Sequence, residues 1–200
     1  DHVGNFDLFH AATFHLQDRE MGYATGRHMA KPVFSGAFDV EDVVGMVRNT
    51  YAGRVAFHDG DAQIAPGVSV HLIGGHTMGL QVARVATRRG WVVLASDASH
   101  FYANMEQTRP FPIVYNVADM VEGYARLLHE LPIFARRIAF GARAVADVGP
   151  VGTNLVDDHL LDFFRLELMA RTGVRALLVP GLTAIVAVLV TIPPGGGRDE

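Results

Sequence analysis

The hydrophobic and polar positions of the first half of the chain alternate between strand-like and helix-like patterns. Residues 12–16 are mostly apolar and predict a strand. Residues 18–26 predict a helix, because acidic residues open the segment and a glycine ends it. Residues 39–53 carry four valines at helical spacing, with Asp39 in the N-cap position, and predict a second helix.

Further strands and one more helix are predicted up to residue 131. Four short segments lie between turn signals, and three of them alternate or run apolar as strands do. These segments are residues 54–61, 68–75, 80–90 and 91–97. Residues 116–131 form an amphipathic pattern with Asn116 or Asp119 near its start, which predicts a helix.

The pattern changes after residue 131. Residues 133–149 are rich in Ala and Arg, and residues 154–173 have helix start and stop signals, so both favour helices. Residues 176–197 carry no charge and are near the minimum length of a membrane span, but Pro180 and Gly181 interrupt them. We favour a buried element over a membrane contact for this run. The chain is therefore divided into residues 1–131 and a helical, apolar tail of residues 132–200.

Composition narrows the classes of function. The 200 residues are half hydrophobic, which suits one core or slightly more, and the net charge of −4 gives no basic surface for nucleic acid. The chain has no Cys, so a metal would be held by His, Asp or Glu. It begins without Met or a signal peptide, so we expect Asp1 to be a truncation point or a processed end. We expect a cytoplasmic protein, and nothing in the sequence indicates an oligomeric state.

Four residues at strand ends or at the start of the chain are candidate metal ligands. Asp1 and His2 open the chain, His76 follows an apolar strand within "GGHTMG", and Asp97 follows the apolar strand "WVVLA". Alone, Asp97 could cap the next segment, His76 could be a turn residue, and the first two could belong to a frayed terminus. Together they favour a site for Zn, Mn, Fe or Co, since loops at strand ends carry ligands and imidazole and carboxylate suit these metals.

Apart from His100, which follows Asp97, the remaining seven histidines have no comparable setting, so we interpret them as surface or core residues. They are His10, His15, His28, His58, His71, His129 and His159.

The segments "DHVGN", "GGHTMGLQ" and "LASDASHFYAN" resemble the metallo-β-lactamase fold superfamily, and within it the N-acyl-homoserine lactonase-like group. "FHLQDREM", "HDGD" and "RPFPIVYNV" add to the resemblance, which covers residues 1 to about 131. It implies an α/β (α+β) fold that is part of an αββα sandwich, with the N-terminal sheet truncated.

The resemblance also bears on the two ends of the sequence. Asp1 and His2 match the last two residues of the superfamily signature H-x-H-x-D-H, so we expect the chain to begin just after the first two histidines. The family places its last metal-binding His in a P-G-H segment, which is not found here. From residue 133 the sequence does not resemble the family, and a frameshift, a recombination or a diverged tail would each explain that.

The resemblance implies a hydrolase with two metal ions, most typically Zn²⁺. Asp1 and His2 would bind the second metal, His76 the first, and Asp97 would bridge both. Such enzymes open the lactone ring of N-acyl-homoserine lactones through a bridging hydroxide, and Asp1 or Asp97 would pass a proton to the leaving group. Because only four of the seven expected ligands are present, we expect the activity of this chain to be impaired.

Residues that follow Asp97 are candidates for contact with the substrate. His100 and Tyr102 could donate a hydrogen bond to the developing oxyanion, although both could be ordinary loop residues. Phe101, Met105 and Phe111 could form an apolar wall for an acyl chain, although such residues are as often plain core.

Two alternatives to a lactonase are kept open. The fold could hydrolyse a thioester, a β-lactam or a phosphoester, or the chain could be a non-catalytic remnant with a membrane-associated tail. In each enzymatic case the partner is a small molecule. The shared-site hypothesis requires the side chains of His76 and Asp97 to lie within roughly 10 Å of each other, since metal–ligand bonds are near 2 Å.

Overall fold

The computed structural model describes residues 3–4, 6–87, 90–131, 138–139 and 189–191. Its strands are β1 (Thr13–Gln17), β2 (Val55–His58), β3 (Ala62–Ala65), β4 (Val68–Leu72), β5 (Gln81–Thr87), β6 (Gly90–Leu94), β7 (Ile138–Ala139) and β8 (Leu189–Thr191). The α-helices are α1 (Asp18–Ala24), α2 (Pro32–Ser35), α3 (Val40–Tyr51), α4 (Tyr102–Glu106) and α5 (Val117–Ala125). Short 3-10 turns are η1 (Phe6–Leu8), η2 (Arg27–Ala30) and η3 (Ser96–Ala98), and η4 (Arg126–Glu130) is a π-helical turn.

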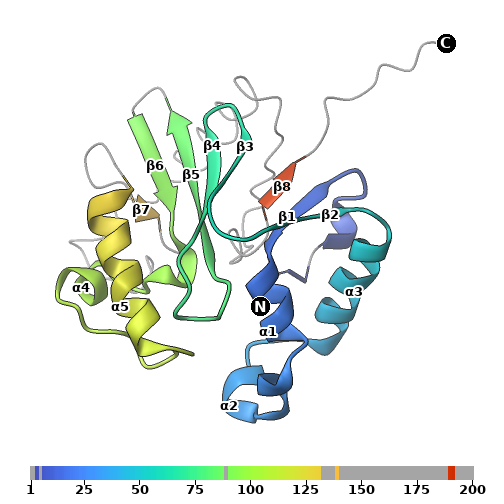
Figure 1. Ribbon diagram of the computed structural model, residues 1–200, viewed down its shortest axis with the longest axis horizontal. Helices are drawn as coiled ribbons and strands as arrows, with labels where there is room; N and C mark the ends of the chain where they lie inside the picture. Colours follow the sequence, from blue (N-terminus) through green and yellow to red (C-terminus); the bar gives the residue numbers. More distant parts are fainter. Residues whose placement is uncertain (1–2, 5, 88–89, 132–137, 140–188, 192–200) are drawn as a thin grey trace.

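Among the described residues, two sheets form the centre of the molecule. The smaller has the strand order β2-β1-β8, with β1 and β2 parallel, and the larger has the order β3-β4-β5-β6-β7. Figure 1 shows the sheets next to each other, with α4 and α5 on the outer side of the larger sheet and α3 on the outer side of the smaller one. This layering confirms the predicted α/β fold and the partial αββα sandwich.

Helix caps follow the sequence signals closely. The Asp39 carboxylate accepts a hydrogen bond from the Glu41 backbone N–H at 2.8 Å and starts α3. The Asn116 side chain accepts from the N–H groups of Ala118 and Asp119 and starts α5, so Asn116 and not Asp119 is the cap.

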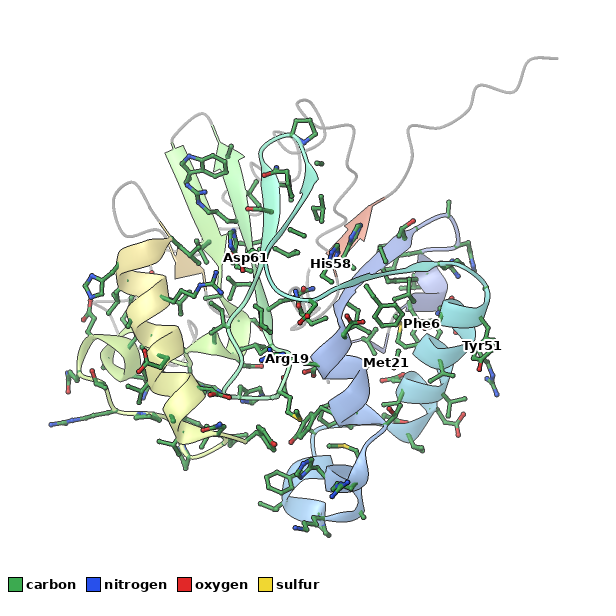
Figure 2. All side chains as sticks on the ribbon, viewed as in Figure 1. Phe6, Arg19, Met21, Tyr51, His58 and Asp61 are labelled. Atoms are coloured by element: carbon green, nitrogen blue, oxygen red, sulfur yellow. The ribbon has the colours of Figure 1, made fainter. Side chains whose placement is uncertain are left out.

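The buried face of α3 differs from the expected valine stripe. Gly45, Met46 and Asn49 are its buried residues, whereas Val40 is 69 % exposed. A Cβ on Gly45 would lie 2.1 Å from the Phe6 ring, so this ring occupies the helix face at the glycine. Figure 2 shows Phe6 beside α3, with the exposed Tyr51 at the far end of the helix.

In the part of the chain that the structure describes, the core consists of two clusters. The larger lies within the five-stranded sheet and against α4, α5 and η4, and its fully buried members include Val70, Val82, Val93 and Met120. The smaller joins β1 to α3 through Ala12, Phe14 and Met46. Strands β1 and β4 are buried at several consecutive positions, and their runs of apolar and β-branched residues explain why the strand predictions for this region hold.

Buried glutamines connect the two sheets. Gln17 at the end of β1 donates to the Gln81 side chain at 3.0 Å, and Gln81 at the start of β5 donates to the His15 carbonyl at 2.8 Å. Gln17 also exchanges two hydrogen bonds with the backbone of Gly60. Because these groups are buried and paired, they fix the distance between the layers.

Three further departures from the sequence predictions concern β3, the helix over residues 116–131 and the tail. β3 was not predicted, because its four residues barely alternate and Gln63 on this edge strand is exposed. The predicted helix over residues 116–131 is α-helical only to Ala125 and then becomes the π-helical turn η4.

The third departure is in the tail. Ile138–Ala139 pairs with β6 in parallel and Leu189–Thr191 pairs with β1 antiparallel, so the helical expectation for residues 132–200 is wrong at these positions. The reason is that the edges of β6 and β1 offer unpaired backbone groups that a short strand can satisfy. The other expectations for the tail, with His159 and the run 176–197 up to β8, lie outside the described residues, and the division near residue 131 stays a prediction.

None of the helices in the described part of the chain is both long and apolar enough to span a membrane.

Candidate functional site

The loop between β4 and β5 carries His76 on a tightly held backbone. The N–H groups of Ile73 and Gly74 both donate to the Leu80 carbonyl and close the base of the loop. Gly75 has a φ of +89°, and a Cβ there would lie 2.6 Å from the Met120 backbone. The left-handed backbone therefore requires glycine at Gly74 and Gly75, and the close approach to α5 requires it at Gly75 as well.

Hydrogen bonds fix the orientation of the His76 ring. Nδ1 donates to the Ile113 carbonyl at 3.0 Å, and the Tyr115 N–H donates to the carbonyls of Gly75 and His76. The residue is 9 % exposed. A proton placed on Nδ1 leaves the neutral imidazole with its lone pair on Nε2, which is the arrangement that a backbone carbonyl imposes on metal-binding histidines.

Asp97 lies in η3, directly after β6, and its position depends on a strained residue. Ser96 has a φ of +46°, which is unusual for a residue with a side chain, and it is buried. Such conformations cost about 1–3 kcal/mol and persist where the surrounding structure enforces them. The side chain of Asp97 is 23 % exposed, so the carboxylate is partly open to solvent.

Three predicted site residues come together around this carboxylate. His76 Nε2 lies 3.9 Å from one Asp97 oxygen, and His100 Nε2 lies 3.5 Å from the other. The two imidazole rings are edge-on, with centroids 5.5 Å apart. The expectation that His76 and Asp97 share one edge of the sheet is confirmed.

The donors of this cluster fit part of a metal site. An imidazole lone pair that faces a carboxylate oxygen offers two ligands of the types that Zn²⁺ takes. Next to His76, the buried Thr77 hydroxyl has no hydrogen-bond partner among the described residues. Within the same residues no group of three His, Asp or Glu side chains has the geometry to hold a metal, so a complete site requires donors from elsewhere. Asp1 and His2, which the sequence suggests for this role, lie outside the described residues, and all four ligand roles stay predictions.

The aromatic residues after Asp97 divide into two groups. Phe111 stacks on His100 with centroids 4.4 Å apart and lies 6.1 Å from Phe101, which is 37 % exposed. Met105 is only 2 % exposed and belongs to the large core cluster, and Tyr102 packs against that cluster. The interpretation of Met105 as a wall for a ligand is therefore corrected, because the core covers its side chain.

The sequence analysis missed two polar clusters. His15 Nδ1 lies 3.0 Å from His58 Nε2, and the rings stack with centroids 5.2 Å apart. Burial, followed by the charge of His58, lowers the pKa of His15 to about 4. Parallel pairing of β1 with β2 brings these residues together, and no local signal in the sequence indicates it.

The second cluster is a chain of hydrogen bonds at the end of β4. His71 bonds to the Asp61 carboxylate at 2.7 Å and to the Ser69 hydroxyl at 2.8 Å, and Arg126 also donates to Asp61. Hydrogen bonds from Arg126 and His71 lower the pKa of Asp61, although burial alone would raise it. Figure 2 shows Asp61 beside the large sheet and His58 beside the small one.

An apolar hollow lies between α1 and α3. Its lining includes Leu16, Met21 and Met46 but neither His76 nor Asp97. The hollow is therefore distinct from the cluster around Asp97.

Comparisons with known proteins identify the fold. No protein-family model and no curated protein matches the chain. Solved structures do match it, with probability 1.00, and they carry the fold that the resemblance implied, a metallo-β-lactamase-type αββα sandwich.

Several of the matching structures are N-acyl homoserine lactone hydrolases. One is such a hydrolase with the product N-hexanoyl-L-homoserine bound at the catalytic metal center, with 23 % identity, a TM-score of 0.56, and coverage of 70 % of this chain and 51 % of that one. A second is a quorum-quenching N-acyl homoserine lactone lactonase with the same identity and TM-score, of which 53 % is covered. A third, from B. thuringiensis, holds N-decanoyl-L-homoserine at the active site. The chain spans about half the length of these structures, and likeness at this identity shows the fold alone.

Proposed function

We propose that this chain is part of a metal-dependent hydrolase that opens the ring of N-acyl-homoserine lactones. The observation that carries the proposal is the approach of His76 Nε2 to the Asp97 carboxylate at 3.9 Å, with Nδ1 held by a backbone carbonyl. The fold shared with N-acyl homoserine lactone hydrolases supports the choice of substrate class.

By resemblance to the family, His76 would hold one metal, Asp1 and His2 would hold a second, and Asp97 would be a ligand of both. Zn²⁺ suits this set of imidazole and carboxylate ligands, and Mn, Fe or Co would also fit. A bound metal supplies a Lewis acid that polarises the ester carbonyl and makes hydroxide accessible at neutral pH.

The remaining roles belong to side chains around Asp97. The partly exposed Asp97 carboxylate would carry a proton to the leaving alkoxide. His100, oriented by its stacking on Phe111, would donate a hydrogen bond toward the oxyanion. Tyr102 is the second candidate for this donor. Phe101 and Phe111 would form the apolar surface for the acyl chain.

A panel of substrates tests the proposal. The 200-residue chain and the same chain preceded by His-x-His-x are supplied with zinc and assayed with an acyl-homoserine lactone, a thioester, a β-lactam and a phosphoester. We expect little or no hydrolysis by the first protein, because the described residues supply too few ligands, and lactone-selective hydrolysis by the second once a late His is supplied as well.

Asp97→Asn should remove the activity of the extended protein, whereas Asp61→Asn, a carboxylate outside the cluster, should retain most of it. If the extended protein prefers the thioester, the β-lactam or the phosphoester, the proposed substrate class changes from lactones to that compound. If both folded proteins hydrolyse none of the four, the chain is a non-catalytic relative.

A further inference from the structure

The His76 loop is fastened to α1, a helix of the opposite layer, by one buried carboxylate. Glu20 is 5 % exposed, and its Oε2 accepts a hydrogen bond from the Gly79 N–H at 2.9 Å. The two residues are 59 positions apart in the sequence, and the bond is buried. A carboxylate that accepts from a backbone N–H in such a setting makes one of the stronger hydrogen bonds in proteins.

Close packing accompanies this hydrogen bond. A Cβ on Gly79 would lie 2.2 Å from the Glu20 backbone nitrogen, so the loop and the first turn of α1 touch backbone to backbone. On the other side, Gly75 meets the Met120 backbone in the same way. The loop that carries His76 is thus clamped between α1 and α5.

We propose that Glu20 is a positioning residue for the metal site, and that it acts through Gly79 by fixing the loop on which His76 stands. This inference rests on the proposed function, because it takes His76 as a ligand. Metal sites tolerate little displacement of their ligands, and loss of groups that orient a ligand typically lowers metal affinity about 10- to 100-fold.

The neighbouring glutamines differ from Glu20 in the groups that they contact. Gln17 and Gln81 also bridge the layers, but they bond to each other and to backbone groups outside residues 74–79. Gln81 therefore offers a matched control, since its loss removes buried hydrogen bonds between the layers without releasing Gly79.

Four variants of the full chain test the proposal. Glu20→Gln keeps an oxygen acceptor for the Gly79 N–H, and Glu20→Met removes the acceptor at similar side-chain volume. Glu20→Asp shortens the side chain by one methylene group, so its carboxylate no longer reaches the Gly79 N–H. Gln81→Met is the control. The measurements are hydrogen exchange of the Gly79 amide without metal, zinc affinity by competition with a chelator, and the melting temperature.

We expect Glu20→Met and Glu20→Asp to raise Gly79 exchange at least tenfold and to lower zinc affinity about 10- to 100-fold. Glu20→Gln should stay within about threefold of wild type. Gln81→Met should lower the melting temperature and leave Gly79 protection near that of the parent. If Glu20→Met does not fold, the Gly79 exchange and zinc affinity of Glu20→Asp decide whether the proposal holds.

Two results would overturn the proposal. One is wild-type Gly79 protection and zinc affinity in Glu20→Met or Glu20→Asp. The other is a loss of zinc affinity in Gln81→Met equal to that in Glu20→Met, since that would make the role merely structural. If wild type binds no zinc, the proposed function fails, and Gly79 exchange alone decides whether Glu20 holds the loop.

Discussion

Glycines beside the site illustrate how single residues determine its geometry. Gly79 has no room for a side chain next to Glu20, whereas nothing lies within 4 Å of a Cβ placed on Gly22 in α1. The sequence marks both as glycine and cannot distinguish them, because the difference arises from contacts between distant segments.

We therefore predict opposite effects of alanine at the two positions. Gly79→Ala should destabilise the fold by roughly 1–3 kcal/mol or more, because the new methyl group forces the loop away from α1. Gly22→Ala should stabilise it by about 0.5–1 kcal/mol, since alanine favours an open helical position. Urea denaturation measures both, and equal stability of the two variants would contradict the close packing at Gly79.

Individual residues were predictable where chemistry was local. His76 and Asp97 stand out because each follows an apolar strand, and the structure brings them together. The burial of Met105 was not predictable, because periodicity alone does not separate a core methionine from one that lines a ligand site.

Helix α3 provides a test at the scale of an element. Its first turn depends on the hydrogen bond that the Asp39 side chain accepts from the Glu41 N–H. Asp39→Ala should cost about 1 kcal/mol of stability, as is typical for loss of an N-cap. Glu41→Ala is the matched control, because it removes a charge from the same turn and leaves the cap intact. Thermal or chemical denaturation measures both variants. If Asp39→Ala loses no more stability than Glu41→Ala, Asp39 does not cap the helix.

The pairing of β1 with β2 makes the fold sensitive to acid. The pKa of His15 is lowered from 6.5 to about 4, chiefly by burial and then by His58, so the unfolded chain takes up this proton at a higher pH than the folded one. The corresponding stability is fully present above pH 6.5 and is lost as the pH falls toward 4, by at most about 1.4 kcal/mol per pH unit.

Denaturation at pH 7 and pH 5 measures this effect. His15→Asn should reduce the difference in stability between the two pH values, while the same change at the exposed His129 should preserve it. An unchanged pH dependence in His15→Asn would show that this histidine does not titrate as described.

At the scale of the whole molecule, the elements of each layer could be predicted from the sequence, but the contacts that join the layers could not. Apolar or alternating runs and capped helices predicted the elements that build the sandwich, because each signal lies within one segment. The bonds between layers, such as Gln17 with Gln81 and Glu20 with Gly79, join residues about 60 positions apart and leave no local trace. The strand Ile138–Ala139 was missed for the same reason, since its partner β6 determines its conformation.

The central claim is that His76 and Asp97 bind a metal, and zinc affinity tests it most directly. The chain is stripped with a chelator and titrated with zinc against a competing indicator, alongside His76→Ala, Asp97→Asn and the exposed His129→Ala. The account predicts weak binding by wild type and His129→Ala, because few ligands are available, and at least a tenfold loss in each of the other two variants. Zinc affinity that is the same in all four proteins would contradict a metal site at this edge of the sheet.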